Sequence, residues 1–183
     1  MIQMVPIDTI ADEAVEQLLD RAFGRDRHVR TAYRLRAGTR ALPALSFALI
    51  EREALLGSIQ CWPVQFDGDD GTVWPLVLVG PVAIVPERQQ EGLGRRLMEA
   101  ALAAAAGGPP LTLIGDPEYY GRFFGFDAAA TALWRLPGPV ERHRLLARGA
   151  NVPATAGMLG PRHHASAAAR PLPPDLYPTP PAP

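Results

Sequence analysis

Two glycines near the middle of the chain, Gly92 and Gly94, are the residues whose type and spacing point most directly to chemistry. They follow an apolar run that predicts a strand, and an amphipathic pattern that predicts a helix begins on top of them. A helix N-terminus presents free backbone N–H groups and the positive end of the helix dipole, and both favour a phosphate. Glycine has no Cβ, so a phosphate oxygen can come close to those donors. The pattern therefore predicts a site for a phosphorylated cofactor.

Two common phosphate motifs do not fit this loop. A Walker loop needs a lysine after its second glycine, and the chain contains no lysine. The dinucleotide motif G-x-G-x-x-G needs a third glycine where Leu97 stands. What remains is Q-x-x-G-x-G, formed by Gln89, Gly92 and Gly94. This motif resembles the acetyl-CoA loop of the GNAT (GCN5-related) N-acetyltransferase superfamily, and the sequence of residues 79–98 is similar to the bacterial YhbS-like branch of those enzymes.

A second segment, residues 111–126, supports the resemblance. It is similar to the family sequence G-D-P-x-Y-Y-x-R-F-G-F, but it carries one residue more, Arg-Phe-Phe-Gly-Phe, at its end. Counting forward from Gly115 makes Tyr120 the family's reactive tyrosine, whereas counting backward from Gly125 puts Gly121 in that place. We favour the forward count because a helix end absorbs an extra residue more easily than a strand-to-helix turn, and the choice between Tyr119 and Tyr120 stays open.

The resemblance implies that acetyl-CoA binds along the segment from Val82 to Arg95. Pro81 interrupts an apolar run that otherwise predicts a central strand, and a proline there marks a bulge or a strand end. In the family, such a bulge splays two parallel strands, so that backbone groups pair with the pantetheine amides and the loop amides surround the diphosphate. The expected cofactor-binding residues are Val82, Ala83, Ile84, Gln89, Gln90, Glu91, Gly92, Leu93, Gly94 and Arg95. Arg95 and Arg96 are candidates for additional charge near the phosphates.

The order of apolar patterns predicts a hairpin-rich first half followed by a β-α-β-α-β second half, which is a three-layer α+β arrangement with a mixed sheet. The resemblance adds that the sheet is mostly antiparallel and contains the splayed parallel pair. We expect one domain over residues 1–162 and a disordered Ala/Pro-rich tail over residues 163–183. The expected elements are strands over 2–6, 45–50, 55–66, 73–85, 111–114 and 130–136, and helices over 11–23, 28–37, 93–106 and 140–148; Thr9 is the expected cap of the first helix.

Composition excludes several classes of function. A net charge of −1 argues against non-specific nucleic-acid binding. No apolar run reaches the roughly 20 residues of a membrane span, and no secretory signal is evident, so a cytoplasmic protein is expected. The sequence leaves a homodimer open.

Other candidate residues carry weaker signals. Cys61 lies in an apolar strand without a neighbouring histidine, so we expect it to pack rather than to carry an acyl group. His163 and His164 lack further ligands for a metal, and no metal is expected. Glu51 and Glu53 are candidates for a general base by residue type only. Six arginines surround the second helix: Arg25, Arg27, Arg30, Arg34, Arg36 and Arg40. We favour a charged solvent face for them, with anion recognition by Arg30 or Arg34 as the alternative.

The sequence thus predicts an N-acetyltransferase that moves an acetyl group from acetyl-CoA to a primary amine, small molecule or peptide, by direct attack in a ternary complex. Tyr120 is the expected proton donor to the departing thiolate, and the Ile84 N–H is expected to stabilise the carbonyl oxygen. One alternative is a GNAT-fold protein that binds acyl-CoA without turnover. Another is a nucleotide-binding regulator that uses the same loop.

Overall fold

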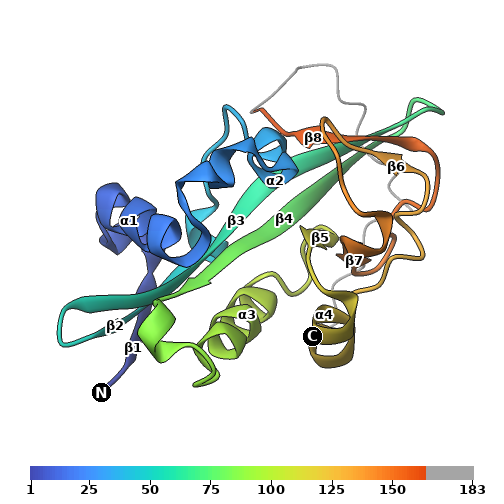
Figure 1. The fold of residues 1–183 in the computed structure, drawn as a ribbon. Coiled ribbons are helices and arrows are strands. Elements are labelled where there is room, and N and C mark those ends of the chain that lie inside the picture. The colour runs from blue at the N-terminus through green and yellow to red at the C-terminus, as the bar shows by residue number, and fades with distance from the viewer. Residues whose placement is uncertain (164–183) are drawn as a thin grey trace.

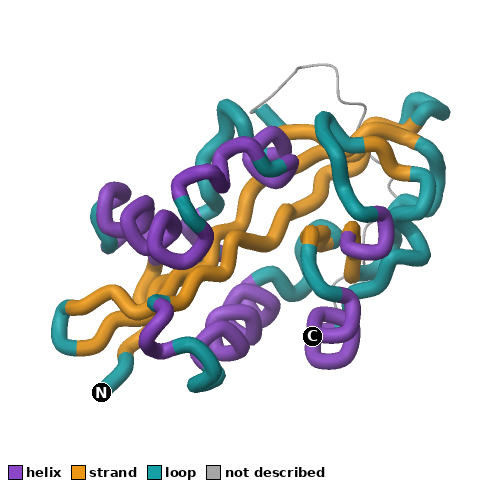
Figure 2. Tube along the Cα trace, in the orientation of Figure 1, coloured by secondary structure: helices purple, strands orange, loops and turns teal. Residues whose placement is uncertain are grey.

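The computed structural model describes residues 1–163. Its strands are β1 (Gln3–Pro6), β2 (Phe47–Glu51), β3 (Ala54–Gly68), β4 (Val73–Ile84), β5 (Leu111–Ile114), β6 (Trp134–Arg135), β7 (Leu145–Arg148) and β8 (Gly157–Pro161). Its α-helices are α1 (Asp12–Phe23), α2 (Thr31–Leu35), α3 (Leu93–Ala104) and α4 (Pro117–Phe124). Figure 2 distinguishes helices, strands and loops along the chain, and 3₁₀ turns lie between several of these elements.

The strands form one sheet in the order β1-β2-β3-β4-β5-β7, and β8 pairs with the far end of β3 and with β6. Neighbouring strands are antiparallel except for the pairs β4–β5 and β6–β8, which are parallel. In Figure 1, α1 and α2 lie on one side of the long strands β3 and β4, and α3 and α4 lie on the other. This arrangement confirms the expected three-layer α+β fold with a mixed, mostly antiparallel sheet.

The helices α1 and α3 bury the apolar faces that their spacing predicts. In α1 the buried residues are Val15, Leu18 and Leu19, and in α3 they are Leu93, Leu97, Met98 and Ala101. Both sets belong to one core cluster with the central strands. Fully burying one such Leu contributes about 1.5–3 kcal/mol, so these faces fix the two helices against the sheet.

The turn between β3 and β4 has the form that its sequence predicts. Gly71 has a φ of 83°, a value that glycine adopts without steric cost. Asp70 Oδ1 accepts hydrogen bonds from the backbone N–H of Thr72 at 3.0 Å and from its hydroxyl at 2.6 Å. The long hairpin that results brings Pro81 and the glycine loop back across the sheet.

The expected helix over residues 140–148 is wrong. Residues Arg142–Arg144 form a 3₁₀ turn, and β7 follows as an antiparallel partner of β5. Leu145, Leu146 and Ala147 are all buried, because the chain is covered on both faces of the sheet here. A continuous apolar run of this length suits a buried strand and a buried helix equally, so pairing with β5 decides the outcome.

Other boundaries also differ from expectation. Thr9 does not cap α1: its hydroxyl donates to Pro6 O at 2.7 Å, and the N-cap position is Ala11. The second helix is confined to α2 because Arg30 is extended and separates it from a 3₁₀ turn at Arg25–Val29. The strand expected over 130–136 is reduced to β6, and β8 was not expected at all. Apart from His163, the expected tail lies outside the described residues. Within them, no helix is long and apolar enough to cross a membrane.

Candidate active site

The two parallel strands β4 and β5 pair over only two positions and then part. Val77 is in register with Leu111 and Leu78 with Thr112, and no further pairs follow. On the other edge of β4, the register with β3 shifts between Ile59 and Cys61, where Gly80 and Pro81 together oppose one residue of β3. The bulge therefore lies where Pro81 predicts it, and β4 leaves its neighbour at that point.

The direction of the backbone beyond the bulge follows from one hydrogen bond. The Val85 N–H donates across to Leu56 O of the β3 side at 2.8 Å. Because successive residues of a strand point their backbone groups to opposite edges, Val82 and Ile84 direct theirs into the gap beside β5. Ala83 instead pairs with Ser58 of β3 and is 1% exposed, so it offers neither backbone nor side chain to the gap.

The loop after β4 leads into α3 without a side-chain cap. Gln90 and Gly92 both have positive φ, 70° and 76°. Gly92 is the N-cap of α3, and no side chain hydrogen-bonds to the helix start. The first bond that closes the helix joins the Arg96 N–H to Gly92 O at 3.1 Å, which leaves the preceding amides free. Nothing lies within 4 Å of the position that a Cβ at Gly92 would take, so the loop is open to a ligand.

Ion pairs stabilise this loop. Arg88 donates from Nε to Glu91 Oε1 at 2.7 Å and from Nη1 to Glu51 Oε2 at 3.0 Å. The hydrogen bond from Arg88 holds the pKa of Glu51 below its usual value. Arg95 Nε donates to Glu99 Oε1 at 2.7 Å. The Arg95 side chain therefore pairs with Glu99 within α3, and Glu51 stabilises the loop through its contact with Arg88.

A small cavity of about 210 Å³ lies beside the gap and the helix start. Four of the expected cofactor-binding residues line it: Val82, Ile84, Gln89 and Gly94. Ala22, Phe23 and Met98, which sequence reasoning missed, complete it together with Tyr119 and Tyr120. Of the other expected residues, Gln90, Glu91, Gly92 and Arg95 are exposed in the loop and the first turn of α3, and the Leu93 side chain is buried.

A large cavity of about 770 Å³ adjoins the small one. Both are lined by Phe23, Val82, Met98 and Tyr120, so the two spaces meet at the point where β4 leaves β5. The outer walls of the large cavity come from α2 and from residues 139–144. Thr31 Oγ1 of α2 donates to Pro139 O, and Arg34 Nη1 donates to Pro137 O at 2.8 Å, so these hydrogen bonds hold the two walls together.

The ring of Tyr120 lies directly against Gly115. A Cβ at Gly115 would stand 2.3 Å from Tyr120 Cε2, so only glycine admits the ring in this position. Asp116 caps α4 by accepting the Glu118 N–H at 3.0 Å, and Gly125 ends the helix with a φ of 68°. The segment's one residue beyond the family sequence lies within α4. The start of the helix is unaffected, so Tyr120 keeps its place against Gly115.

Burial, reinforced by the neighbouring Tyr119 and opposed by the nearby charge of Arg144, raises the pKa of the Tyr120 phenol. A phenol with a raised pKa stays protonated at neutral pH and can donate its proton. Tyr119 is more exposed, at 37%, and lines only the small cavity.

Cys61 packs in the core, as its sequence context predicts. It is 1% exposed, and burial raises the pKa of its thiol to about 12. A thiol in that state has almost no thiolate at neutral pH and is a poor nucleophile. The other open candidates also lie away from the cavities: neither Glu51 nor Glu53 lines them, and His163 is exposed.

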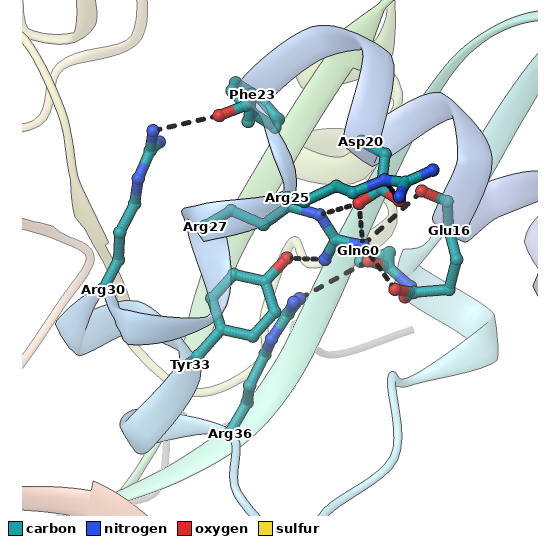
Figure 3. Close-up of polar contacts among 9 residues, drawn as sticks. All are labelled: Glu16, Asp20, Phe23, Arg25, Arg27, Arg30, Tyr33, Arg36 and Gln60. Atoms are coloured by element: carbon teal, nitrogen blue, oxygen red, sulfur yellow. Dashed lines mark hydrogen bonds and ion pairs between the residues drawn. The ribbon is translucent and has the colours of Figure 1, made fainter.

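The charged solvent face expected for the six arginines is wrong for two of them. Arg27 is 1% exposed and Arg36 is 8% exposed, because each is enclosed by aromatic and polar side chains from α1, α2 and β3. Figure 3 shows both guanidinium groups beside Tyr33. Arg30 lines the large cavity, whereas the exposed Arg34 does not.

Comparison with known proteins identifies this architecture. The model of the acetyltransferase (GNAT) family matches residues 10–112. The chain belongs to the GNAT acetyltransferase family. As a GNAT protein it is similar in fold to the GNAT family N-acetyltransferase YhbS from Escherichia coli in complex with CoA, with a TM-score of 0.64 and 24% identity over 88% of this chain and 89% of that one. A GNAT family acetyltransferase from Brucella melitensis in complex with acetyl-CoA gives a TM-score of 0.61 and 25% identity over 90% of this chain and 97% of that one. The comparison with curated proteins gave no match.

Sequence motifs identified four cofactor-binding candidates that line the small cavity, but few of the residues that line the large one. The loop and the tyrosine segment are short, contiguous motifs. The large cavity is built from separate segments with no shared sequence signature, such as Val29, Gly80, Ile114 and Val140.

Proposed function

We propose that this GNAT protein transfers an acetyl group from acetyl-CoA to a primary amine of a small molecule or peptide, by direct attack within a ternary complex. The observation that carries the proposal is the junction of two cavities at the splayed end of β4. One cavity is continuous with the glycine loop and the other is closed by α2. Two reactants that enter from opposite sides would therefore meet beside Tyr120.

The donor side fits an acyl-CoA. The uncapped start of α3 and the open loop at Gly92 offer amides for a diphosphate. The backbone edges of Val82 and Ile84 offer the pairing that an added strand would use, which suits the amides of a pantetheine arm. When bound, acetyl-CoA supplies an acetyl group activated as a thioester. The similar E. coli and B. melitensis structures, which are complexes with CoA and acetyl-CoA, support the same ligand here.

The chain's own groups then serve the transfer. A neutral amine forms the new C–N bond while the C–S bond breaks. The Ile84 N–H, which faces the gap, stabilises the negative charge that develops on the carbonyl oxygen. Tyr120 gives its proton to the departing sulfur and is reprotonated from solvent. The proton that the amine loses goes to water or to a carboxylate of the large cavity, where Asp116 and Glu141 are the carboxylates present among the described residues.

The test is release of CoA thiol from acetyl-CoA with a panel of amines, with the acetylated product identified by mass. Tyr120→Phe is expected to lower kcat by about 10²-fold to 10⁴-fold, because it removes the proton donor and nothing else. Tyr119→Phe is the matched control and is expected to keep kcat. Equal rates in both variants and the native protein would remove Tyr120 from the mechanism. Tight CoA binding without turnover of any amine would favour the alternative, a non-catalytic acyl-CoA sensor.

A further inference from the structure

Arg36 is a buried cation held between two aromatic rings. Its guanidinium carbon is 3.7 Å from the centroid of Tyr33 and 4.5 Å from that of Trp62, and the side chain is 8% exposed. Contact with these two rings restricts how the guanidinium is oriented, and its N–H groups point along its own plane toward hydrogen-bond acceptors. Figure 3 shows the Arg36 side chain beside Tyr33, with Gln60 at its tip.

The protein leaves the charge of Arg36 without an anionic partner among the described residues. Its Nη1 donates to Gln60 Oε1 over a long 3.5 Å, and no carboxylate lies within 4 Å. A largely buried cation without a paired anion is costly, and aromatic faces do not accept its in-plane N–H bonds. Burial accordingly lowers the pKa of Arg36.

The neighbouring Arg27 shows the contrast. Its guanidinium donates to Asp20 Oδ1 at 3.0 Å, to Glu16 Oε2 at 2.5 Å and to the Tyr33 hydroxyl. Both carboxylates therefore already pair with Arg27, and the hydrogen bond from Arg27 also orients Tyr33. Tyr33 in turn forms one wall of the slot that holds Arg36. Arg36 is thus the arginine of this cluster that has no carboxylate within 4 Å among the described residues.

Arg36 lines the large cavity, which also contains Tyr120. Three other cations line this cavity: Arg27, which is buried in its ion pairs, and the exposed Arg30 and Arg144. Arg30 donates to Phe23 O at 3.2 Å. Of the two carboxylates that line the cavity, Asp116 is engaged in capping α4, and Glu141 is exposed at its rim. The cavity therefore carries Arg36 at its α2 wall and Arg144 near Tyr120, and Arg36 is the buried one of these two.

We propose that Arg36 binds a carboxylate of the acceptor, so that the acceptor class is an amine that also carries a carboxylate, such as an amino acid. This rests on the proposed acetyl transfer. A guanidinium edge pairs with a carboxylate through two parallel hydrogen bonds. The rings of Tyr33 and Trp62 restrict the approach to the guanidinium plane, which favours a planar carboxylate over a tetrahedral phosphate. Arg36 would then hold the acceptor while its amine reaches the thioester beside Tyr120.

The experiment compares kcat/KM for amino carboxylates and their uncharged carboxamides: L-phenylalanine with L-phenylalaninamide, and 6-aminohexanoate with 6-aminohexanamide. O-phosphoethanolamine tests the phosphate class. The native protein is expected to prefer one carboxylate over its amide by at least about 10-fold. Arg36→Gln is expected to lower that preference by about 10-fold to 100-fold. Arg36→Lys keeps the charge without the planar fork and is expected to retain part of it.

Arg40→Gln is the control, because Arg40 is exposed, lies four residues away and lines neither cavity. The preference is a ratio of two rates in one protein sample, so partial unfolding of Arg36→Gln does not change it. Calorimetric titration with CoA shows that the donor site of each variant is intact.

The possible results separate this inference from the proposed function. A preference for carboxamides or for O-phosphoethanolamine, or a carboxylate preference that Arg36→Gln leaves unchanged, would overturn the role of Arg36 while acetyl transfer stands. If no amine is acetylated, the transfer proposal fails. The anion site is then judged by whether the carboxylates bind the CoA-loaded protein in calorimetry and lose that binding in Arg36→Gln.

Discussion

Replacing Gly115 by alanine tests whether the position of Tyr120 matters to the chemistry. The added Cβ would stand 2.3 Å from Tyr120 Cε2 and 2.6 Å from Cδ2, where ordinary contacts begin at 3.4 Å. The ring must therefore move by about 1.1 Å, because Leu113 Cδ1, at 3.0 Å from the added Cβ, crowds the same position. A misplacement of about 1 Å at a reacting group can cost about 10²-fold in rate. We expect kcat of Gly115→Ala to fall by about that factor.

The assay is CoA thiol release at saturating acetyl-CoA and the best amine of the panel. Overpacking of this kind also costs about 1–3 kcal/mol of folding free energy, so thermal melting is measured beside the rate. Gly160→Ala is the matched control, because no atom lies within 4 Å of its added Cβ. It is expected to keep both kcat and melting temperature.

The double variant distinguishes an effect on the position of Tyr120 from a general disturbance of the site. If Gly115 acts only by placing Tyr120, then Gly115→Ala in a Tyr120→Phe background should lower kcat little further. Native-like kcat in the folded Gly115→Ala protein would refute the reasoning, because it would show that the ring can move an ångström without consequence.

Three further predictions concern other buried groups. Cys61→Ala should retain acetyl transfer, and the native thiol, with its pKa near 12, should resist a thiol reagent until the protein unfolds; rapid labelling of folded protein would contradict this. Burial raises the pKa of Tyr120 above the ~10 of a free phenol, so this group adds stability below about pH 10 that is lost as the pH rises through the higher folded-state pKa. Tyr120 should therefore stay protonated up to about pH 10. Any fall in kcat below that pH should be the same in the native protein and in Tyr120→Phe. Arg27→Met should lower the free energy of unfolding, measured in urea, by about 2–3 kcal/mol. This is less than the loss expected for a fully buried ion pair, because Glu16 is half exposed. A loss under about 0.5 kcal/mol would argue against a stabilising role for these ion pairs.

The bulge and the start of α3 could be predicted because each depends on contiguous sequence. Pro81 marked the bulge, and Gly92 and Gly94 marked the loop that leads into the helix; Tyr120 was chosen by counting along the family segment, and its place against Gly115 came from the structure. In each case one residue type is needed for a backbone reason that acts within a few residues. The same local logic predicted the β3–β4 turn and the buried faces of α1 and α3.

The remaining parts depend on contacts between distant segments. β7 is a strand because β5 offers it an edge, and nothing in its own residues separates a buried strand from a buried helix. The arginines of the second helix show the same limit. Charge alone suggested a solvent face, but Trp62 of β3 and Tyr33 enclose Arg36, and Glu16 and Asp20 of α1 hydrogen-bond to Arg27. Which arginines are buried thus depends on tertiary packing.

The central claim is that acyl-CoA lies in the gap beside β4 and on the amides at the start of α3. Backbone hydrogen exchange, measured by mass spectrometry with and without CoA, tests it most directly. Saturating CoA should slow exchange in peptides that cover residues 82–84 and 90–96 and leave β1 and β2 unchanged. Binding of CoA without slower exchange in those two stretches, or no binding at all, would contradict the account.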